Sequence, residues 1–513
     1  MRHRAAILAI VFVACAGNGC VRVEEPGRAA EQGRRPSDDG NVRTIYVDLN
    51  VYNPGHRPAG IGEKLRMARV LADEWAANRP GVRVEYQILG VMAGATKGEG
   101  EDLKTQLLGG IAPEIIHQNA EVAWADTDKG WYLPLDEYLD RPNRYAPGNR
   151  RWMDLFVNQA LVNAKRAPDG KLYCIPLDII ETGIYYNQDL LEAHGIRRLP
   201  DTWQEMEAMF DRLEADGIVP LAVPPRLGAD WGQDIIFEML YHDLMPTLDL
   251  IPTPTNAAEY MGRYLDPPEA GFLFTKGFFT RRDPRWVEMN RLLKDWRRYW
   301  PKELKNSDTL RLFTTGRVAM IWVSSDFTRR MAYDPLLKFR WGVFYIPSMT
   351  ERTSRFAHGT PASVIGGAAM QFHVTNSAVL NGNVEDCIDY LMYLTAPRNA
   401  ERLINEATIF APNIRDVQVS KNLMPFQDIF ARPYCAIKWM ESLDGETKQY
   451  WRRMQDYYLQ GGVDLDGYLA RLEGNFAAWV DSHRGEAGWD FVRMERVWRE
   501  REAELRHALD PER

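Results

Sequence analysis

The sequence is poor in cysteine and lacks the motifs that mark common metal and phosphate sites. Its 513 residues include five cysteines, which form neither a CxxC pair nor a disulfide-dense pattern. The nine histidines show no HExxH motif and no paired helical spacing, and no GxxxxGK or GxGxxG loop is present. We therefore expect no metal and no cofactor. We expect Cys174, Cys387 and Cys435 to be buried thiols, with one disulfide among them as the alternative.

The chain also lacks a long basic segment. Its formal net charge is −8, because 71 acidic residues outnumber 63 lysines and arginines. A nucleic-acid-binding surface needs concentrated positive charge, so we expect no nucleic acid partner. Apolar residues make up 45% and charged residues 26%, which is ordinary for a folded protein. A chain of this length exceeds one compact core and predicts two lobes or domains.

The N-terminus has the pattern of a bacterial secretion signal. Arg2 and Arg4 precede an apolar segment at residues 5–14, which is shorter than the roughly 20 residues that span a bilayer. Cys15 and Cys20 follow, each directly after a small residue. This junction resembles that of bacterial lipoproteins, in which the cysteine receives lipid.

Either cysteine fits the lipidated position. Cys20 gives the more usual signal length, whereas Cys15 follows the more usual apolar residues. We predict a lipoprotein signal at residues 1–19, a flexible tether at residues 20–42 and anchoring to the bacterial membrane on its outer side. The alternative is an ordinary cleaved secretory signal, which also places the protein outside the cytoplasm.

Strand and helix patterns alternate along the chain. A strand at residues 44–51, a helix at 61–78 and a strand at 82–89 form a β-α-β opening, which predicts a parallel sheet. Further predicted strands lie at residues 113–117, 172–175 and 184–186, and further helices at 101–108, 135–139, 187–194, 202–215, after Gly461 and Gly462, and, solvated, at 493–506. This alternation predicts α/β lobes of the doubly wound kind.

Several sequence segments resemble the family 1 extracellular solute-binding proteins of ABC transporters, the group that contains maltose-binding protein. The segments are APEII at residues 112–116, DGKLY at 169–173, YYNQDLL at 185–191, LPDTW at 199–203, GRVAM at 316–320, WGV at 341–343 and the glycine pair at 366–367. Each is short, but they occur in the family's order and at its spacing. The resemblance covers residues 44–413.

The resemblance implies a periplasmic-binding-protein-like α/β fold, with two lobes, crossover hinge segments and a ligand cleft between the lobes. The crossovers would lie near residues 176–182, 324–326 and 395–402. Lobe one would then comprise 43–177 plus 327–395, and lobe two 178–325 plus 400–513. The implied function is capture of a sugar or oligosaccharide by a monomer and delivery to the membrane subunits of an ABC transporter, without enzymatic activity.

Site residues follow from the strand ends and the crossovers, because ligands of such sheets sit beyond the carboxyl ends of strands. Trp231 matches a position where the family often has a stacking tryptophan, and carboxylates and amides can bond adjacent sugar hydroxyls. The predicted ligand-binding residues are Tyr52, Asn53, Gln118, Asn119, Glu121, Trp124, Asp178, Glu181, Thr182, Trp231, Ser324, Asp326, Gly366 and Gly367.

These residues also have structural explanations, and more than one function fits them. Asn53 could only shape its turn, and Trp231 could belong to the core, as we expect for Trp203 and Trp322. Asp178 and Glu181 could instead be the paired carboxylates of a glycan-processing enzyme. A binder of a non-sugar solute, or a sensor partner that works without a transporter, would also fit the sequence.

Overall fold

The computed structural model describes residues 42–89, 99–224, 227–251, 265–301, 306–357, 359, 366–426, 443–486 and 489–510. Cys15, Cys20 and Cys435 lie outside these residues. Cys174 and Cys387 are free and buried, as predicted.

The first sheet has the strand order β2-β1-β3-β10-β4. Its strands are β1 (Arg43–Val47), β2 (Val82–Tyr86), β3 (Ile115–His117), β4 (Ile175–Pro176) and β10 (Gln371–Val374). β1 is parallel to β2 and to β3, whereas β10 is antiparallel to β3 and β4. The predicted β-α-β opening is confirmed. Strand β10 lies between β3 and β4 in the sheet, although it follows β3 by more than 200 residues in the sequence.

The first sheet shares one apolar cluster with helices from two distant parts of the chain. The helices in this part of the chain are α1 (Met67–Ala77), α2 (Glu99–Leu108), α3 (Ala120–Ala123), α4 (Asp136–Leu139), α5 (Gln159–Asn163), α15 (Asn376–Leu380), α16 (Val384–Leu394) and α17 (Pro397–Ala407). The predicted apolar face of α1, which includes Leu71 and Trp75, is buried in this cluster. Ile388 of α16 and Leu403 of α17 pack in the same cluster.

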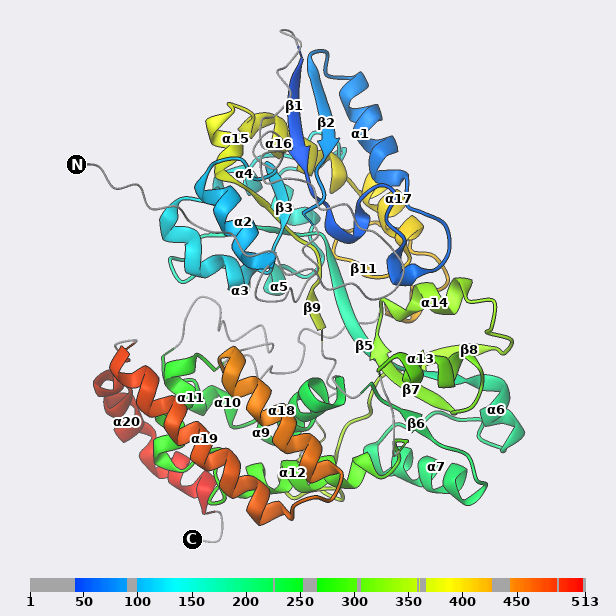
Figure 1. The fold of residues 1–513 in the computed structure, drawn as a ribbon, viewed down its shortest axis with the longest axis vertical. Coiled ribbons are helices and arrows are strands. Elements are labelled where there is room, and N and C mark those ends of the chain that lie inside the picture. The colour runs from blue at the N-terminus through cyan, green and yellow to red at the C-terminus, as the bar shows by residue number, and fades with distance from the viewer. Residues whose placement is uncertain are drawn as a thin grey trace, which may run out of the picture. The chain divides into compact units, whose positions relative to one another are not determined.

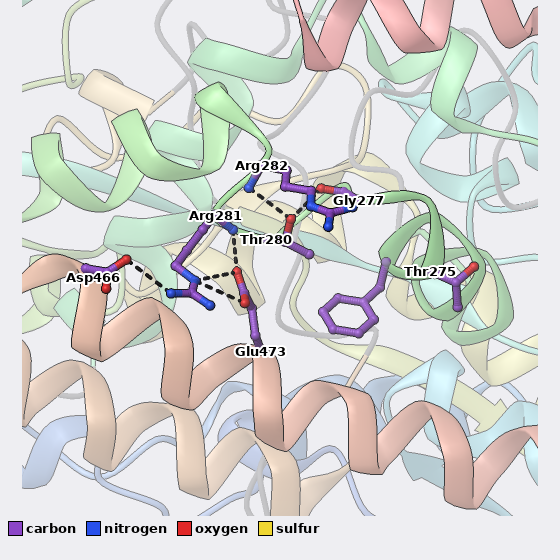
Figure 2. A pocket seen from close by; sticks show the side chains of 8 residues that line it. Thr275, Gly277, Thr280, Arg281, Arg282, Asp466 and Glu473 are labelled. Carbon is purple, nitrogen blue, oxygen red and sulfur yellow. Dashed lines mark hydrogen bonds and ion pairs between the residues drawn. The ribbon is translucent and has the colours of Figure 1, made fainter.

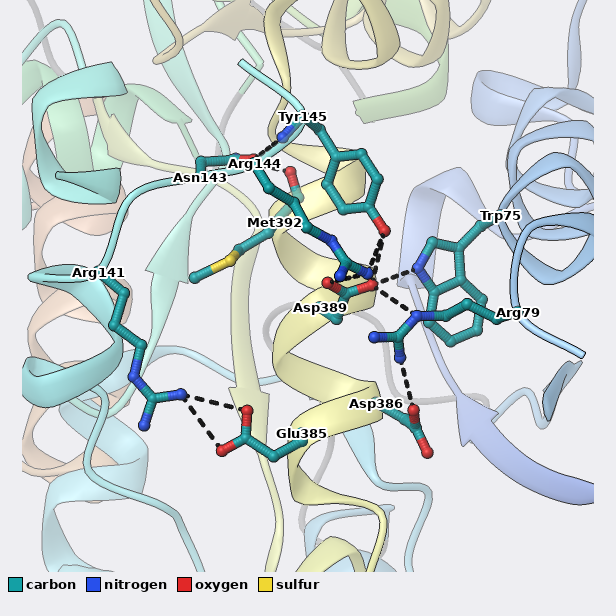
Figure 3. A network of polar contacts seen from close by, with 10 residues as sticks. All are labelled: Trp75, Arg79, Arg141, Asn143, Arg144, Tyr145, Glu385, Asp386, Asp389 and Met392. Atoms are coloured by element: carbon teal, nitrogen blue, oxygen red, sulfur yellow. Dashed lines mark hydrogen bonds and ion pairs between the residues drawn. The ribbon is translucent and has the colours of Figure 1, made fainter. Parts of the chain in front are cut away.

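A polar network joins α16 to α1 on this side of the molecule (Figure 3). Asp389 accepts hydrogen bonds from the Trp75 Nε1 at 2.8 Å and the Tyr145 hydroxyl at 2.7 Å. The guanidinium groups of Arg79 and Arg144 lie 3.0 and 2.7 Å from the same carboxylate. Asp389 is 8% exposed, so these donors replace the water that its charge would otherwise bind. The network fixes the register of two helices that are about 300 residues apart.

The second sheet is built around one long strand, β5 (Asp178–Asn187), and has the order β11-β5-β7-β6. The other strands are β6 (Leu221–Ala222), β7 (Met320–Ser324), β8 (Trp341–Phe344), β9 (Gly366–Ala368) and β11 (Ala411–Pro412). The first half of β5 pairs with β9 and β11, and the second half pairs with β7 and β8. One strand therefore connects two groups of pairing partners.

Most remaining helices pack into the largest apolar cluster, together with the second half of β5. They are α6 (Gln188–Ala193), α7 (Trp203–Ala215), α9 (Gln233–Tyr241), α10 (Met245–Leu248), α11 (Pro267–Lys276), α12 (Pro284–Arg297), α18 (Gly445–Leu459), α19 (Leu465–Glu486) and α20 (Phe491–Leu509). The helices α13 (Asn306–Thr314) and α14 (Phe327–Tyr333) pack in a separate, smaller cluster that contains Phe313 and Phe327. Trp296 stacks edge-on against Trp203 at 5.3 Å and lies 5.5 Å from Trp322 between ring centroids. Trp203 and Trp322 are fully buried, so their assignment to the core is confirmed.

The C-terminal helices belong to the same cluster. α18 and α19 pack against each other and against α12, and α20 packs on α10 and α11, as the orange and red helices of Figure 1 show. We predicted that the last helix would be solvated, and this is wrong. Met494, Trp498 and Leu505 are buried because they follow the helical period on the face that meets α10 and α11.

Three sequence assignments of local structure are corrected. The first strand ends at Val47, because a 3-10 turn with Asn50 at φ 54° follows directly. The strand expected at residues 172–175 is reduced to β4, while Leu172 forms only an isolated bridge with Arg166. Helix α7 has its N-cap at Thr202 as predicted, but the Glu205 carboxylate accepts from the backbone of Asp201 and not of the N-cap residue.

The described residues 408–423, which follow α17, differ from the predicted division of the chain. We assigned residues from 400 onward to lobe two, but Ile409, Phe410, Ile414 and Leu423 lie in the apolar cluster of the first sheet. The alternating apolar residues of this segment cover that cluster before the chain reaches the C-terminal helices.

Helix α14 is tied to the first part of the chain through a buried arginine. Arg329 is 2% exposed and donates to four backbone carbonyl groups. The acceptors are Ile61 at 3.0 Å, Glu63 at 2.6 Å, Glu406 at 2.9 Å and Ala407 at 2.8 Å. A guanidinium group satisfies this arrangement because its donors fan out in one plane.

Candidate functional site

β5 and its neighbours bring together most of the residues that we predicted at the crossovers. Thr182 pairs with Ser324 across β5 and β7, and Glu181 pairs with Gly366 across β5 and β9. The Ser324 hydroxyl donates to Asp326, which begins α14. The second crossover therefore lies directly beside the first, as the strand order requires.

Tyr52 and Asp178 form a buried pair. The Tyr52 hydroxyl donates to the Asp178 carboxylate, and the Met370 backbone amide donates to its other oxygen at 2.8 Å. Both side chains are 0% exposed. Burial raises the pKa of Asp178 to about 7, against the opposing effect of its two hydrogen bonds, and burial and the neighbouring carboxylate raise the pKa of Tyr52. The pair links the turn after β1 to the start of β5.

Asn53 is used by its own turn. Its side-chain oxygen accepts from the Leu49 backbone amide at 2.9 Å, and its side-chain nitrogen donates to Asp48 at 2.5 Å. Asn53 is only 2% exposed, so the side chain fixes the loop that follows β1.

The residues after β3 are held by partners from other segments. The Glu121 carboxylate accepts from the amino group of Lys165, which is 5% exposed, and the Trp124 indole donates to the Lys165 carbonyl at 3.4 Å. Glu121 and Trp124 are partly buried, as are Gln118 and Asn119. Lys165 thus contacts both Glu121 and Trp124 and holds their side chains next to each other.

Two buried histidines support the same loop. The His373 Nε2 lies 3.0 Å from the Gln118 carbonyl, and the His117 Nδ1 accepts from the Gln371 backbone amide at 3.0 Å. Burial lowers the pKa of His373 to about 3 and that of His117 to about 4. Both rings are neutral near pH 7, so Nε2 of His373 carries the proton that it donates to the carbonyl.

Glu181 is also buried and meets a tyrosine. The Tyr345 hydroxyl donates to the Glu181 carboxylate at 2.7 Å and lies 3.3 Å from the Pro425 carbonyl. The backbone of Glu181 is fixed by Ser325, whose amide donates to the Glu181 carbonyl at 2.7 Å. The second crossover thus holds the backbone of Glu181, and Tyr345 holds its carboxylate.

The predicted glycines approach a strand. A Cβ atom on Gly366 would stand 2.0 Å from the Ile180 carbonyl oxygen, and Gly367 has φ 145°. β9 can pair with β5 only because no side chain stands at Gly366. The close approach of Gly366 is thus to the β5 backbone, a role that does not need a ligand.

Trp231 lies on a one-turn π-helix, Gly228–Gly232, that leads into α9. The indole is partly buried and packs against the largest apolar cluster. π-turns inside helices are frequent at functional sites because they redirect one or two side chains. The neighbouring Asp230 carboxylate accepts two hydrogen bonds from Arg452 of α18, at 2.6 and 2.5 Å.

Several of these contacts could not be found from the sequence. Lys165, Tyr345 and Arg452 lie 44, 164 and 222 residues from the side chains that they contact. They carry no local motif, and pattern spacing reports only neighbours within one element.

Two of the cavities that described residues line are formed by the helical part of the chain. One, of about 480 Å³, is lined by Phe274, Thr275, Gly277, Thr280, Arg281, Arg282, Asp466 and Glu473 (Figure 2). The other, of about 550 Å³, is lined by Phe272, Thr275, Lys276, Arg484, Phe491, Val492, Glu495, Arg496 and Arg499. None of the predicted ligand-binding residues lines either cavity.

The first cavity is closed on one side by an ion-pair cluster. The Arg281 side chain donates to Glu473 at 3.2 Å and to Asp466 at 3.2 Å, both on α19. Figure 2 shows these three side chains converging on one another, so the positive charge of Arg281 is already compensated by two carboxylates. Among the described residues, no group of three or more histidine, cysteine or acidic side chains could hold a metal ion.

The arrangement of two mixed sheets connected through one long strand and surrounded by helices is that of the two-lobed solute-binding proteins. Residues 66–369 match the family described as bacterial extracellular solute-binding protein. The chain belongs to this family. No helix among the described residues is both long and apolar enough to cross a bilayer.

Relatives with named ligands show the same fold. RafE from Streptococcus pneumoniae is 16% identical, with a TM-score of 0.59 over 87% of this chain and 100% of its own, and RafE is also known in complex with raffinose. A chitin oligosaccharide binding protein is 17% identical, with a TM-score of 0.59 over 86% of this chain and 100% of its own. The multiple sugar-binding protein of Streptococcus mutans is 25% identical over 48% of this chain, which spans about half, 53%, of that relative's length.

Proposed function

We propose that this protein captures a sugar or oligosaccharide outside the cytoplasm and delivers it to an ABC importer. The family match over residues 66–369 carries this proposal. Relatives with the same fold or with partial sequence identity are named for raffinose, chitin oligosaccharides and multiple sugars, which supports a saccharide as the ligand class.

The proposed cleft lies between one lobe that contains the first sheet and another that contains the largest apolar cluster. Its lobe-one face would carry Gln118, Asn119, Glu121 and Trp124, and its lobe-two face would carry Trp231. Carboxylate and amide groups bind pairs of adjacent hydroxyls, while an indole covers the apolar face of a sugar ring. A ligand that touches both faces favours the closed arrangement of the lobes.

The crossover residues have a different proposed role. Four of the predicted ligand-binding residues are buried by contacts within the chain, and we assign them to the hinge that joins the lobes. They are Tyr52, Asn53, Asp178 and Gly366. Glu181, Thr182 and Gly367 are buried beside the same strand pairs, whereas Ser324 is partly buried and Asp326 is exposed. Of these five residues, we therefore keep Ser324 and Asp326 as proposed ligand contacts. A binding protein has no need of a reactive acid, and we propose no enzymatic step.

A saccharide panel tests the proposal. We expect raffinose, chitin oligosaccharides or a related oligosaccharide to raise the melting temperature, because a ligand at 100 times its Kd adds about 2.7 kcal/mol to stability. Thermal shift followed by calorimetric titration measures the effect, and reducing-end analysis after incubation detects hydrolysis. Release of hydrolysis products would support a glycan-processing enzyme instead, and absence of any shift across the panel would remove the saccharide assignment.

Trp231→Ala provides the matched variant for this panel. Loss of a stacking surface should weaken saccharide binding by about 1–3 kcal/mol, as aromatic stacking does for nucleic acid bases. The melting temperature of the free variant is the control. If Trp231 instead serves only the core, the variant would lose about 3–5 kcal/mol of stability while its folded fraction would bind with unchanged affinity.

We also propose that the mature chain is anchored to the membrane by a lipid on Cys20 or Cys15. The protein expressed in full length in a bacterium should fractionate with membranes, and mass spectrometry should find a lipid on one of the two cysteines. Serine replacements at each position identify the modified residue, because only one of them should release the protein. A soluble, unmodified full-length product would contradict the anchor.

A further inference from the structure

The π-turn that carries Trp231 is held from two sides. On one side its backbone packs closely against two tryptophans: a Cβ atom on Gly228 would lie 2.6 Å from the Trp300 ring, and one on Gly232 would lie 3.3 Å from the Trp296 ring. A Cβ atom on Gly228 would collide with the Trp300 ring, and Gly232 leaves little room beside Trp296. The turn therefore has little freedom on the side that faces the core.

On its other side the turn is clamped by α18. Arg452 forms a bidentate ion pair with Asp230, whose side chain is 15% exposed, while that of Arg452 is 30% exposed. One helical turn further, the Gln455 side-chain nitrogen donates to the Gln233 side-chain oxygen at 2.7 Å, and both of these side chains are buried. Asp230 and Gln233 are three residues apart, as are Arg452 and Gln455, so two contacts in matching register align α18 with the turn.

The helix that supplies this clamp lies outside the part of the chain that matches the family, whereas Asp230 and Gln233 lie inside it. The match ends at residue 369, whereas α18 spans Gly445–Leu459. α18 also packs on α12 and α19 within the same apolar cluster that receives Trp231. The helix is therefore a rigid support and not a loose appendage, and a bidentate arginine on it fixes both the position and the orientation of its partner.

We infer that Arg452 is a positioning residue for the ligand site: α18, through the Arg452–Asp230 ion pair and the Gln455–Gln233 hydrogen bond, sets the orientation of the Trp231 indole. The inference rests on the proposed function for the part that concerns saccharide binding. The C-terminal helices thereby gain a role: they belong to the apolar core of the second lobe and, through α18, hold the turn that presents the Trp231 indole to the sugar.

The test follows Trp231 directly, without a ligand. The protein is produced with 5-fluorotryptophan, and Trp231→Phe identifies the ¹⁹F resonance of Trp231. In Arg452→Met we expect this resonance to shift or broaden while the resonances of the buried Trp203 and Trp322 keep their positions. Asp230→Asn, which keeps the side-chain shape, should produce a smaller change in the same resonance, and Arg452→Lys an intermediate one, because lysine cannot form the bidentate pair.

Affinity gives the second readout. Against the saccharide that the wild-type protein binds in the panel, Arg452→Met should weaken binding by roughly tenfold. This is the lower end of the loss in affinity when a residue that orients a metal ligand is removed from a metal site. Arg281→Met is the matched control, because it removes an ion pair of the C-terminal helices that does not touch the turn, and it should leave both the Trp231 resonance and the affinity unchanged.

The outcomes separate this inference from the proposed function. An unchanged Trp231 resonance in Arg452→Met overturns the inference, as does an equal movement of all tryptophan resonances or an equal response in Arg281→Met. If the Trp231 resonance moves selectively but the wild-type protein binds no saccharide of the panel, the positioning stands and the proposed ligand class fails.

Discussion

Arg329→Met is expected to lower the free energy of unfolding by about 3 kcal/mol or more, since a buried acceptor left without its donor costs about 1–3 kcal/mol. Arg329 is 2% exposed and serves four carbonyl groups from two separate segments, residues 61–63 and 406–407. Methionine fills most of the volume but donates nothing, so the loss isolates the hydrogen bonds. Denaturant titration, monitored by circular dichroism, measures the shift of the midpoint.

Arg330→Met is the control for this prediction. Arg330 is the next residue of α14, and its side chain is 28% exposed and pairs with Asp334 at 3.0 Å one helical turn away. The partner Asp334 is buried but keeps its hydrogen bond from the Leu336 backbone amide, so the control should cost clearly less than the loss of four buried carbonyl partners. Equal losses for the two variants would show that α14 is sensitive to any change, and would remove the special role of the buried guanidinium.

Asp178 should make the protein less stable as the pH rises from about 4 to about 7. The pKa of Asp178 is raised to about 7 by burial, whereas its carboxyl titrates near 4 in an unfolded chain. Between these values the unfolded chain has released the proton and the folded chain still holds it, so stability is fully present below pH 4 and is lost as the pH approaches 7. The whole change is at most about 4 kcal/mol, since each pKa unit is worth about 1.4 kcal/mol.

The measurement compares the wild-type protein with Asp178→Asn over this pH range. Asparagine has nearly the same shape and does not titrate, so the difference between the two stability curves should fall steadily from pH 4 to pH 7 and then level off. In Tyr52→Phe the hydrogen bond that favours the charged carboxylate is absent, so the fall should extend to higher pH. Parallel curves for wild type and Asp178→Asn would show that the carboxyl titrates normally.

Local patterns in the sequence predicted the elements that depend on a single amphipathic segment. The helix at α1 was found because its apolar residues repeat with the helical period, and the N-cap of α7 because Thr202 precedes a periodic segment. Predicting the two-lobed fold required the order of several short motifs along the chain. No single helix or strand pattern contains information about which distant segments pair. The burial of Trp498 was not predicted because the helix contains many more arginines and glutamates than buried apolar residues. Only Met494, Trp498, Leu505 and Ala508 are buried.

The site could be predicted only as a region. Strand ends and crossovers indicated Asp178, Glu181 and Ser324, and the structure places these residues on neighbouring strands. What the sequence could not tell is which side chains are already used by other parts of the chain. The partners of Asp178 and Glu181 are tyrosines 126 and 164 residues away, and pairing over such distances depends on packing and not on spacing.

The two apolar clusters are completed at very different times during synthesis. The described residues of the cluster around the first sheet end with Leu423, so all of them have been synthesised 85 residues before Ala508, the last residue of the largest cluster. The largest cluster starts at Ile184 but includes Leu505 and Ala508, close to the last residue of the chain. Any lobe built on that cluster stays incomplete, with part of its apolar surface uncovered, until the helices α18, α19 and α20 have been made.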